Sequence, residues 1–301
     1  MKKKFLLYLL SFCILCITSC ISAQTFEWAK NYNCGAQEYG TSIGTDIAGN
    51  IYITGSSHYF TGGSGSYYYE LFWKLNSTGD VQWVDTLEMT ATKSVTDING
   101  ITYITGNNKI AKYNSLGQQE WLHVIPIAGF FQSIALNPQG GIAVVGRALY
   151  NDTTKSILSY YDENGNCLWT KINEFPWAGT IPYAVNFDKF GCFYIAVNGY
   201  VDPTTGNKGF LIKYDLNGNI LYSRTIIHTP HEITIDNHNN IYIAGEFGIS
   251  YPININGTTH YASDASKFLV KYNQQGDVLW YKMIGGSIGH YDIATDNSNN
   301  L

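Results

Sequence analysis

Short stretches in which apolar and polar residues alternate recur along this chain, each beside a string of turn-forming residues. Between Ile51 and Thr54, two isoleucines alternate with a tyrosine and a threonine, as in a half-buried strand. The residues just before them, Asp46 to Asn50, include types that tolerate left-handed backbone angles. A strand, a tight turn and a second strand are therefore predicted, and no long helical period is found.

This hairpin string, DIAGNIYITG at Asp46 to Gly55, is repeated along the chain. Further copies occur at Asp97–Gly106, Asn137–Gly146, Asp188–Val197 (where the glycine is delayed to Gly199) and Asp236–Gly245, and a sixth begins at Asp296. A second string, KLNSTGDVQW, has a glycine at its sixth position and an aromatic residue at its tenth. It occurs at Lys74–Trp83, Lys112–Trp121, Tyr160–Trp169, Lys213–Tyr222 and Lys271–Trp280. Five copies without an internal insertion predict a second hairpin in each repeat, and hence a four-stranded antiparallel unit.

One such sheet cannot bury both of its faces, so neighbouring units must stack. Four-stranded units repeated in this way predict an all-β fold, a β-propeller of four-stranded antiparallel blades. We expect five complete blades, an N-terminal fourth strand at Phe26–Tyr32 and the start of a sixth blade, which together form an open arc with a raw edge. The aromatic residues that begin the fourth strands are expected to pack between blades: Trp28, Trp83, Trp121, Trp169, Tyr222 and Trp280.

The motifs W-A-K, T-D-x-x-G-N-I-Y-I-T-G and F-L-x-K-Y-N-x-x-G-x-x-x-W together resemble a family of bacterial β-propeller repeats. That family is described as seven-bladed and is common in secreted proteins of the Bacteroidetes. The resemblance covers residues 26–301 and implies a fold rather than a reaction, because the shared residues are turns and packing positions.

The N-terminus is expected to be a targeting segment. Lys2, Lys3 and Lys4 precede an apolar run too short to span a membrane, which predicts a signal peptide over residues 1–23 and a repeat domain over residues 24–301. The sequence Ile17-Thr18-Ser19-Cys20 also resembles a lipobox, in which Cys20 would be lipidated. The protein is therefore expected to be exported, either secreted or held at the cell surface as an outer-membrane lipoprotein.

Charge argues against nucleic acid as a partner. Without residues 1–23 the chain has 15 basic and 23 acidic residues, a net charge of −8, whereas nucleic-acid binding needs a basic patch. Cys34, Cys167 and Cys192 remain, and we interpret Cys167 and Cys192 as small buried residues.

The chain stops inside a repeat, since Asn299–Leu301 matches Gly49–Ile51. We therefore expect a fragment of a longer propeller. The total number of blades and any domain after Leu301 are not given by this sequence.

Variation in length is concentrated in the connections between the second and third strands and between blades. The longest connections, Ser56–Glu70 and Glu246–Lys267, are rich in Tyr, Ser, Gly and Asn, a composition suited to binding a protein or a polysaccharide. The expected binding residues are Tyr59, Tyr67, Tyr68, Tyr69 and Tyr261.

Two further sets of residues bear on metal binding. The repeated Asp46, Asp97, Asp188, Asp236 and Asp296 could suggest calcium, but one aspartate capping each hairpin turn accounts for the same positions. His228 and His231 have a metal-like spacing without an evident third ligand. No metal, cofactor or catalytic constellation is predicted.

The leading hypothesis is an exported non-enzymatic scaffold or recognition module. The alternative is a propeller enzyme, either a quinoprotein-like dehydrogenase or a polysaccharide hydrolase or lyase. It would show charged residues from three or more blades meeting near the axis.

Overall fold

The computed structural model describes residues 28–32, 37–61, 65–125, 129–150, 153–172, 180–202, 206–226, 229–247, 253–255, 258–260, 266–285, 292–296 and 298–301. The chain divides into two units, residues 1–32 and residues 33–301, which are treated separately. In the first unit, residues 28–32 form no strand. The described part of the predicted N-terminal fourth strand is thus not in a strand, and residues 26–27 lie outside the described residues.

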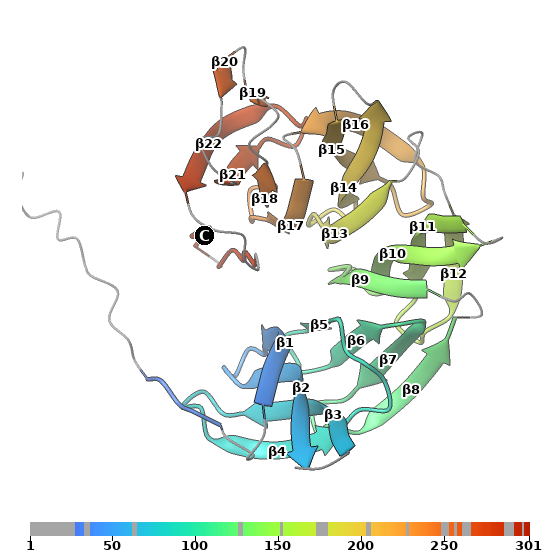
Figure 1. Ribbon diagram of the computed structural model, residues 1–301, viewed down its shortest axis with the longest axis vertical. Helices are drawn as coiled ribbons and strands as arrows, with labels where there is room; N and C mark the ends of the chain where they lie inside the picture. Colours follow the sequence, from blue (N-terminus) through green and yellow to red (C-terminus); the bar gives the residue numbers. More distant parts are fainter. Residues whose placement is uncertain are drawn as a thin grey trace, which may run out of the picture. The chain divides into compact units, whose positions relative to one another are not determined.

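The second unit contains five four-stranded antiparallel sheets, as the repeats predict, and every element in its described part is a strand. We call the sheets blades 1 to 5 in chain order (Figure 1). Blade 1 is β1 (Gln37–Thr45), β2 (Ile51–Thr61), β3 (Gly65–Leu75) and β4 (Val81–Thr86). Blade 2 is β5 (Lys93–Thr96), β6 (Thr102–Gly106), β7 (Lys109–Tyr113) and β8 (Gln119–Val124). Blade 3 is β9 (Gly129–Leu136), β10 (Ile142–Tyr150), β11 (Thr153–Tyr161) and β12 (Cys167–Ile172).

Blade 4 is β13 (Ile181–Phe187), β14 (Phe193–Asp202), β15 (Gly206–Tyr214) and β16 (Ile220–Ile226). Blade 5 is β17 (Thr229–Ile235), β18 (Ile241–Phe247), β21 (Ser266–Tyr272) and β22 (Val278–Gly285). A small hairpin, β19 (Ile253–Ile255) with β20 (Thr258–His260), lies between β18 and β21 in the chain. The first strands of successive blades contact one another in chain order, and we call β1, β5, β9, β13 and β17 the inner strands.

Both hairpin turns of a blade are closed by the same backbone geometry. In the first turn of blade 1, Gly49 has a φ of 78°, and its amide donates to the carbonyl of Asp46. Glycine adopts this left-handed conformation without steric cost, which explains its fixed place in both strings. Asn239 and Asn299 take the position in the fifth and sixth repeats, with φ of 59° and 62°.

Hydrophobic cores lie between blades, because alternate residues of a strand face opposite neighbours. On β6, Ile104 packs with Tyr52 and Phe72 of blade 1, whereas Tyr103 packs with Phe131 and other residues of blade 3. The same alternation builds the cores between blades 3 and 4 and between blades 4 and 5. Each blade is therefore stabilised by its neighbours, as expected for a repeat array.

Four of the fourth-strand aromatic residues lie against the second turn of the following blade, namely Trp83, Trp121, Trp169 and Tyr222. A Cβ atom added at Gly117 would come within 3.0 Å of the Trp83 ring, and one at Gly218 within 3.3 Å of Trp169. The Trp169 indole also donates to the carbonyl of Leu216 at 2.9 Å. The turn glycine thus serves two purposes, a left-handed backbone and room for an aromatic ring.

The inner strands carry a feature that alternation does not predict. In blades 1, 3, 4 and 5 the inner strand has a β-bulge, and the extra residues are Thr41, Gln132, Tyr183 and His231. In blade 2 the equivalent residue, Thr92, comes just before β5. We call these five places the bulge position.

The bulge explains the last glycine of the first repeat string. A Cβ atom at Gly55, Gly106, Gly146 or Gly245 would overlap a backbone carbonyl of the adjacent inner strand. In blade 4 this place is held by Val197, so the glycine is not an absolute requirement.

One face of blade 1 is uncovered within the described part of the chain. Ile43 on β1 is 62% exposed, whereas its repeat equivalents Ile134, Val185 and Ile233 are buried by the preceding blade. At the other end, residues 292–296 and 298–301 form the turn of a sixth repeat without a strand, and the Asp296 amide donates to the Asn300 carbonyl. Among the residues that the structure describes, no helix is long and apolar enough to cross a membrane.

Candidate functional site

The hairpin of β2 and β3 carries a group of exposed tyrosines. These are the longest strands in the described part of the chain, at 11 residues each. The tyrosines are Tyr59 at 37%, Tyr67 at 58%, Tyr68 at 61% and Tyr69 at 46% exposure. The structure therefore brings together four of the five residues expected to bind a ligand. The fifth, Tyr261, lies outside the described residues.

The aromatic rings fall on both faces of the hairpin. Tyr68 is directly opposite His58, with ring centroids 4.3 Å apart, and His58 is 5.2 Å from Tyr39. Tyr59 and Tyr69 meet edge to face on the other side, 6.4 Å apart. Tyr39 is 52% exposed and was not predicted, because it precedes the variable connection in the sequence.

One carboxylate accompanies the row of Tyr39, His58 and Tyr68. Glu70 lies on the same face and accepts a hydrogen bond from the Ala91 amide at 3.3 Å. Burial raises the pKa of Glu70, and the amide and nearby His58 only partly offset this. The row thus combines apolar rings with a carboxylate acceptor.

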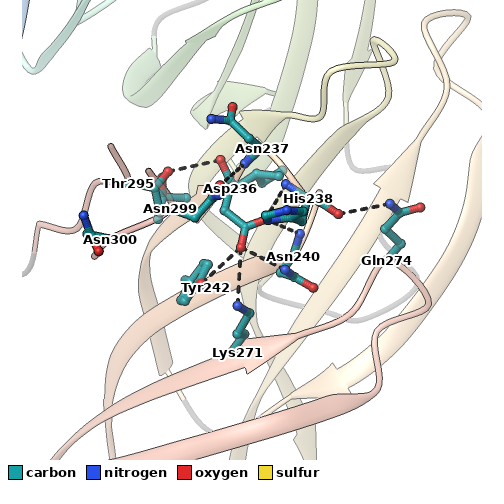
Figure 2. A network of polar contacts seen from close by, with 12 residues as sticks. Asp236, Asn237, His238, Asn240, Tyr242, Lys271, Gln274, Thr295, Asn299 and Asn300 are labelled. Carbon is teal, nitrogen blue, oxygen red and sulfur yellow. Dashed lines mark hydrogen bonds and ion pairs between the residues drawn. The ribbon is translucent and has the colours of Figure 1, made fainter. Parts of the chain in front are cut away.

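The repeated aspartates are hydrogen-bonded to their own turns. Figure 2 shows Asp236, whose Oδ1 accepts from the amides of His238 and Asn240 and whose Oδ2 accepts from Asn240 Nδ2 and the Tyr242 hydroxyl. Lys271 lies 3.4 Å from Oδ2. Asp46, Asp97, Asp188 and Asp296 likewise accept from two amides of their turns. In each of these turns, Oδ1 of the aspartate is thus bonded to two backbone amides.

This arrangement favours the charged carboxylate. Partial burial works to raise the pKa of Asp236, but the hydrogen bonds from Asn240, Tyr242 and Lys271 outweigh it and leave the pKa below its ordinary value. The pKa of Asp46 is lowered in the same way, against the effect of burial.

A second group of polar residues lies on the inner strands. Lys93 of blade 2 places Nζ 2.7 Å from Glu232 Oε1 of blade 5 and 3.6 Å from Asp292 Oδ1 of the sixth repeat. All three stand four residues before the turn aspartate or its equivalent, where blades 1, 3 and 4 have Ser42, Ser133 and Ala184. We call Lys93, Glu232 and Asp292 the inner-strand cluster.

The cluster is largely enclosed at its centre. The side chains of Lys93 and Glu232 are 20% and 17% exposed, whereas that of Asp292 is 64% exposed. Burial works to lower the pKa of Lys93, but the two carboxylates outweigh it and the pKa is raised. Burial also raises the pKa of Glu232, and Lys93 offsets this only in part. The cluster was not predicted from the sequence, although the equivalence of its three positions in the repeat is a signal that could have found it.

His231 adjoins this cluster at the bulge position of blade 5. Its Nε2 lies 3.4 Å from Glu246 Oε1, and its ring meets Tyr183 of blade 4 edge to face at 5.1 Å. The predicted pairing partner His228 lies outside the described residues. Within the described ranges no three His, Cys, Asp or Glu side chains are placed to hold a metal ion.

The remaining predictions concern the cysteines and the N-terminal segment, and the structure describes only some of these residues. Cys167 is exposed at the start of β12, so our interpretation of it as a buried residue is wrong; the outermost strand leaves its side chain in solvent. Cys192 is half-buried. Residues 1–23, with Cys20, lie outside the part of the chain that the structure describes.

Comparison with known proteins bears on the fold. A family model described as "Beta-propeller repeat" matches residues 35–58. The WD40 domain of Pan2 from Neurospora crassa superposes with a TM-score of 0.51 at 10% identity, covering 80% of this chain. The chain is a β-propeller.

Other comparisons add little to this. The propeller spans 65% of the length of the Pan2 domain, and at 10% identity the likeness concerns the fold alone. A protein of unknown function from Bacteroides caccae is similar over 71% of this chain and 89% of its own, at 14% identity and a TM-score of 0.42. No curated protein matches.

Proposed function

We propose that this propeller is an exported, non-enzymatic recognition module that binds a polysaccharide or a protein through the exposed tyrosines of the β2–β3 hairpin. The observation that carries the proposal is the concentration of Tyr59, Tyr67, Tyr68 and Tyr69 on one hairpin, each more than a third exposed.

Tyrosine suits this role because it offers a large, rigid contact area and a polar tip. Burying an exposed tyrosine ring contributes about 2 kcal/mol at roughly 25 cal/mol per Å². Two or three rings supply the hydrophobic part of a binding energy, and the Glu70 carboxylate on the row of Tyr39, His58 and Tyr68 supplies a polar contact.

A screen of the exported form against glycan arrays and candidate surface proteins tests the proposal. Once the screen has identified a ligand, Tyr68→Ala and Tyr69→Ala are each expected to weaken its binding by about tenfold, which corresponds to ~1.4 kcal/mol. Phe190→Ala is the matched control, since Phe190 is 61% exposed in the first turn of blade 4. Unchanged affinity in both tyrosine variants would show that the hairpin is not the binding surface.

A propeller enzyme is the second candidate, and the inner-strand cluster favours it. Lys93, Glu232 and Asp292 come from three repeats and meet, which is the arrangement expected of an enzyme built on repeated blades. Alcohol oxidation with added quinone cofactor and depolymerisation of polysaccharides are the assays for this function. Activity in either assay that is lost in Glu232→Gln would replace the recognition role.

A further inference from the structure

The inner-strand cluster has the properties of a ligand site separate from the hairpin. Lys93 and Glu232 are 139 positions apart in the chain, and Asp292 belongs to a third repeat, yet their charged groups converge. At the equivalent position blades 1, 3 and 4 have the small residues Ser42, Ser133 and Ala184.

The charges of this site are mutually compensated. Lys93 is paired at 2.7 Å with Glu232 and lies 3.6 Å from Asp292. A charged ligand would have to break an enclosed ion pair, which is costly because it leaves one charge unpaired. A neutral ligand with hydroxyl groups can instead donate to the carboxylates and accept from the ammonium group while the pair stays intact.

Two buried polar groups at the bulge position point to the same chemistry. Thr92 Oγ1, next to Lys93, and Gln132 Oε1 of blade 3 are buried and have no hydrogen-bond partner among the described residues. Buried polar atoms are nearly always hydrogen-bonded, so each of these two atoms is open to a hydrogen bond with a bound polar molecule. A hydroxyl group is the simplest partner that both donates and accepts.

The bulge positions also include an aromatic ring. Tyr183 occupies the bulge position of blade 4 and contacts His231, which precedes Glu232 in the chain. Bulges redirect a side chain relative to the alternation of its strand, and here they place polar and aromatic groups on the inner strands. An aromatic face beside paired hydrogen-bonding groups matches the apolar face and vicinal hydroxyls of a sugar ring.

We propose that the inner-strand cluster, together with Thr92, Tyr183 and His231, is a binding site for a neutral carbohydrate. Glu232 and Asp292 accept hydrogen bonds from sugar hydroxyls, Lys93 donates to them, and Tyr183 packs against the ring. The site does not depend on the tyrosines of the hairpin.

The decisive experiment uses Thr92→Val in the full chain, titrated with a panel of neutral mono- and disaccharides by calorimetry or ligand-observed NMR. Removing an unpartnered buried hydroxyl is neutral or stabilising for the fold, so thermal stability is expected to be unchanged or raised. Affinity for the sugar is expected to fall about fivefold to tenfold. Glu232→Gln, which keeps the shape but removes a charged acceptor, is expected to weaken binding further.

Two controls separate the effect of Thr92 from that of the bulge itself and from that of an exposed aromatic residue elsewhere. Thr41→Val changes the bulge position of blade 1, where the hydroxyl is already bonded to Thr54, and is expected to leave sugar affinity unchanged. Phe190→Ala, which removes an exposed aromatic side chain from the first turn of blade 4, is also expected to leave it unchanged. The proposal is overturned if the wild-type protein binds no neutral sugar, if Thr92→Val binds as well as wild type, or if only charged compounds bind at the cluster.

Discussion

The turn aspartates act on stability through the ionised state of their carboxyl groups. Asp46 and Asp236 have pKa values below the ordinary value of 3.8, because the hydrogen bonds of their turns favour the carboxylate over the effect of burial. A lowered folded-state pKa contributes stability that is present above the unfolded value and is lost as the pH falls through the folded value. The propeller is therefore expected to lose stability steadily as the pH falls below about 4.

Replacing Asp236 with asparagine tests this. Asn137 fills the same place in blade 3 and accepts from its turn, so the cap survives, but the charged contact to Lys271 is lost. We expect Asp236→Asn to lower the free energy of unfolding by roughly 1 kcal/mol at pH 7, in urea titrations. At pH 3 the difference from wild type is expected to shrink. If the free energy of unfolding of the variant is lower than that of wild type by the same amount at both pH values, this expectation is wrong.

Blade 3 differs from the other blades at two paired positions, one on its second strand and one on its third. In the other four blades a tyrosine on the second strand lies beneath a lysine on the third, as in Tyr242 and Lys271, whose ammonium is 4.8 Å from the ring centroid. In blade 3 the pair is Ala143 and Tyr160. The Tyr160 hydroxyl accepts from Asn137 and donates to the Gly140 carbonyl, so the ring reaches the turn from the neighbouring strand.

We expect this exchange to be strongly coupled. Ala143→Tyr alone places a second ring beside Tyr160 and is expected to cost about 1–3 kcal/mol, and Tyr160→Lys alone removes the ring and is expected to cost about 3 kcal/mol or more. Combining both changes with Asn137→Asp restores the pattern of the other blades and is expected to recover most of the loss. Denaturation midpoints of the four proteins measure this. If the loss of stability in the combined variant equals the sum of the losses in the single variants, the coupling is contradicted.

At the scale of the blade, the bulge on the inner strand and the glycine of the second strand form one structural device. A Cβ at Gly106 would overlap the carbonyl of Thr90, which leads into β5. Gly106→Ala is expected to destabilise the protein by about 1–3 kcal/mol and to raise hydrogen exchange in β5 and β6. Amides of β14 are the internal control, since Val197 already holds the equivalent place there. Uniform loss of protection in all blades would argue against a local effect.

The elements were largely predictable from sequence, and their irregularities were not. Fixed turn residues such as Gly49 and Gly79 located both hairpins, because few residues other than glycine adopt a positive φ easily. A β-bulge inserts one extra residue into a strand. The alternation of apolar and polar residues over four to eight positions does not reveal such an insertion, so Thr41 and its equivalents were not predicted. The four hairpin tyrosines were predicted from loop composition. The ion pair between Lys93 and Glu232 was not predicted, because contacts between distant repeats depend on how the blades stack.

At the scale of the whole chain, the hydrophobic cores between blades join neighbours, and the Lys93–Glu232 pair is different because it links blade 2 to blade 5. The pair therefore constrains the stacking of three successive blade interfaces at once. Its strength depends on keeping both partners, because removal of one leaves an enclosed charge that has lost its main partner. Asp292 adds a like charge near Glu232 and makes that loss more severe.

We expect Lys93→Met to be destabilising by about 3 kcal/mol at pH 8 and by much less at pH 5. Without Lys93, burial and Asp292 raise the pKa of Glu232 further above its ordinary value of 4.5. A carboxyl whose pKa is raised on folding costs stability as the pH climbs through and above the unfolded value, because the folded state holds the proton more tightly. Adding Glu232→Gln removes the titrating group. The double variant is therefore expected to be more stable than Lys93→Met at pH 8 and to show little of its pH dependence. If urea titrations give the single and the double variant the same free energy of unfolding at both pH values, Glu232 is not held by Lys93 in solution, and the blades are stacked by their hydrophobic interfaces alone.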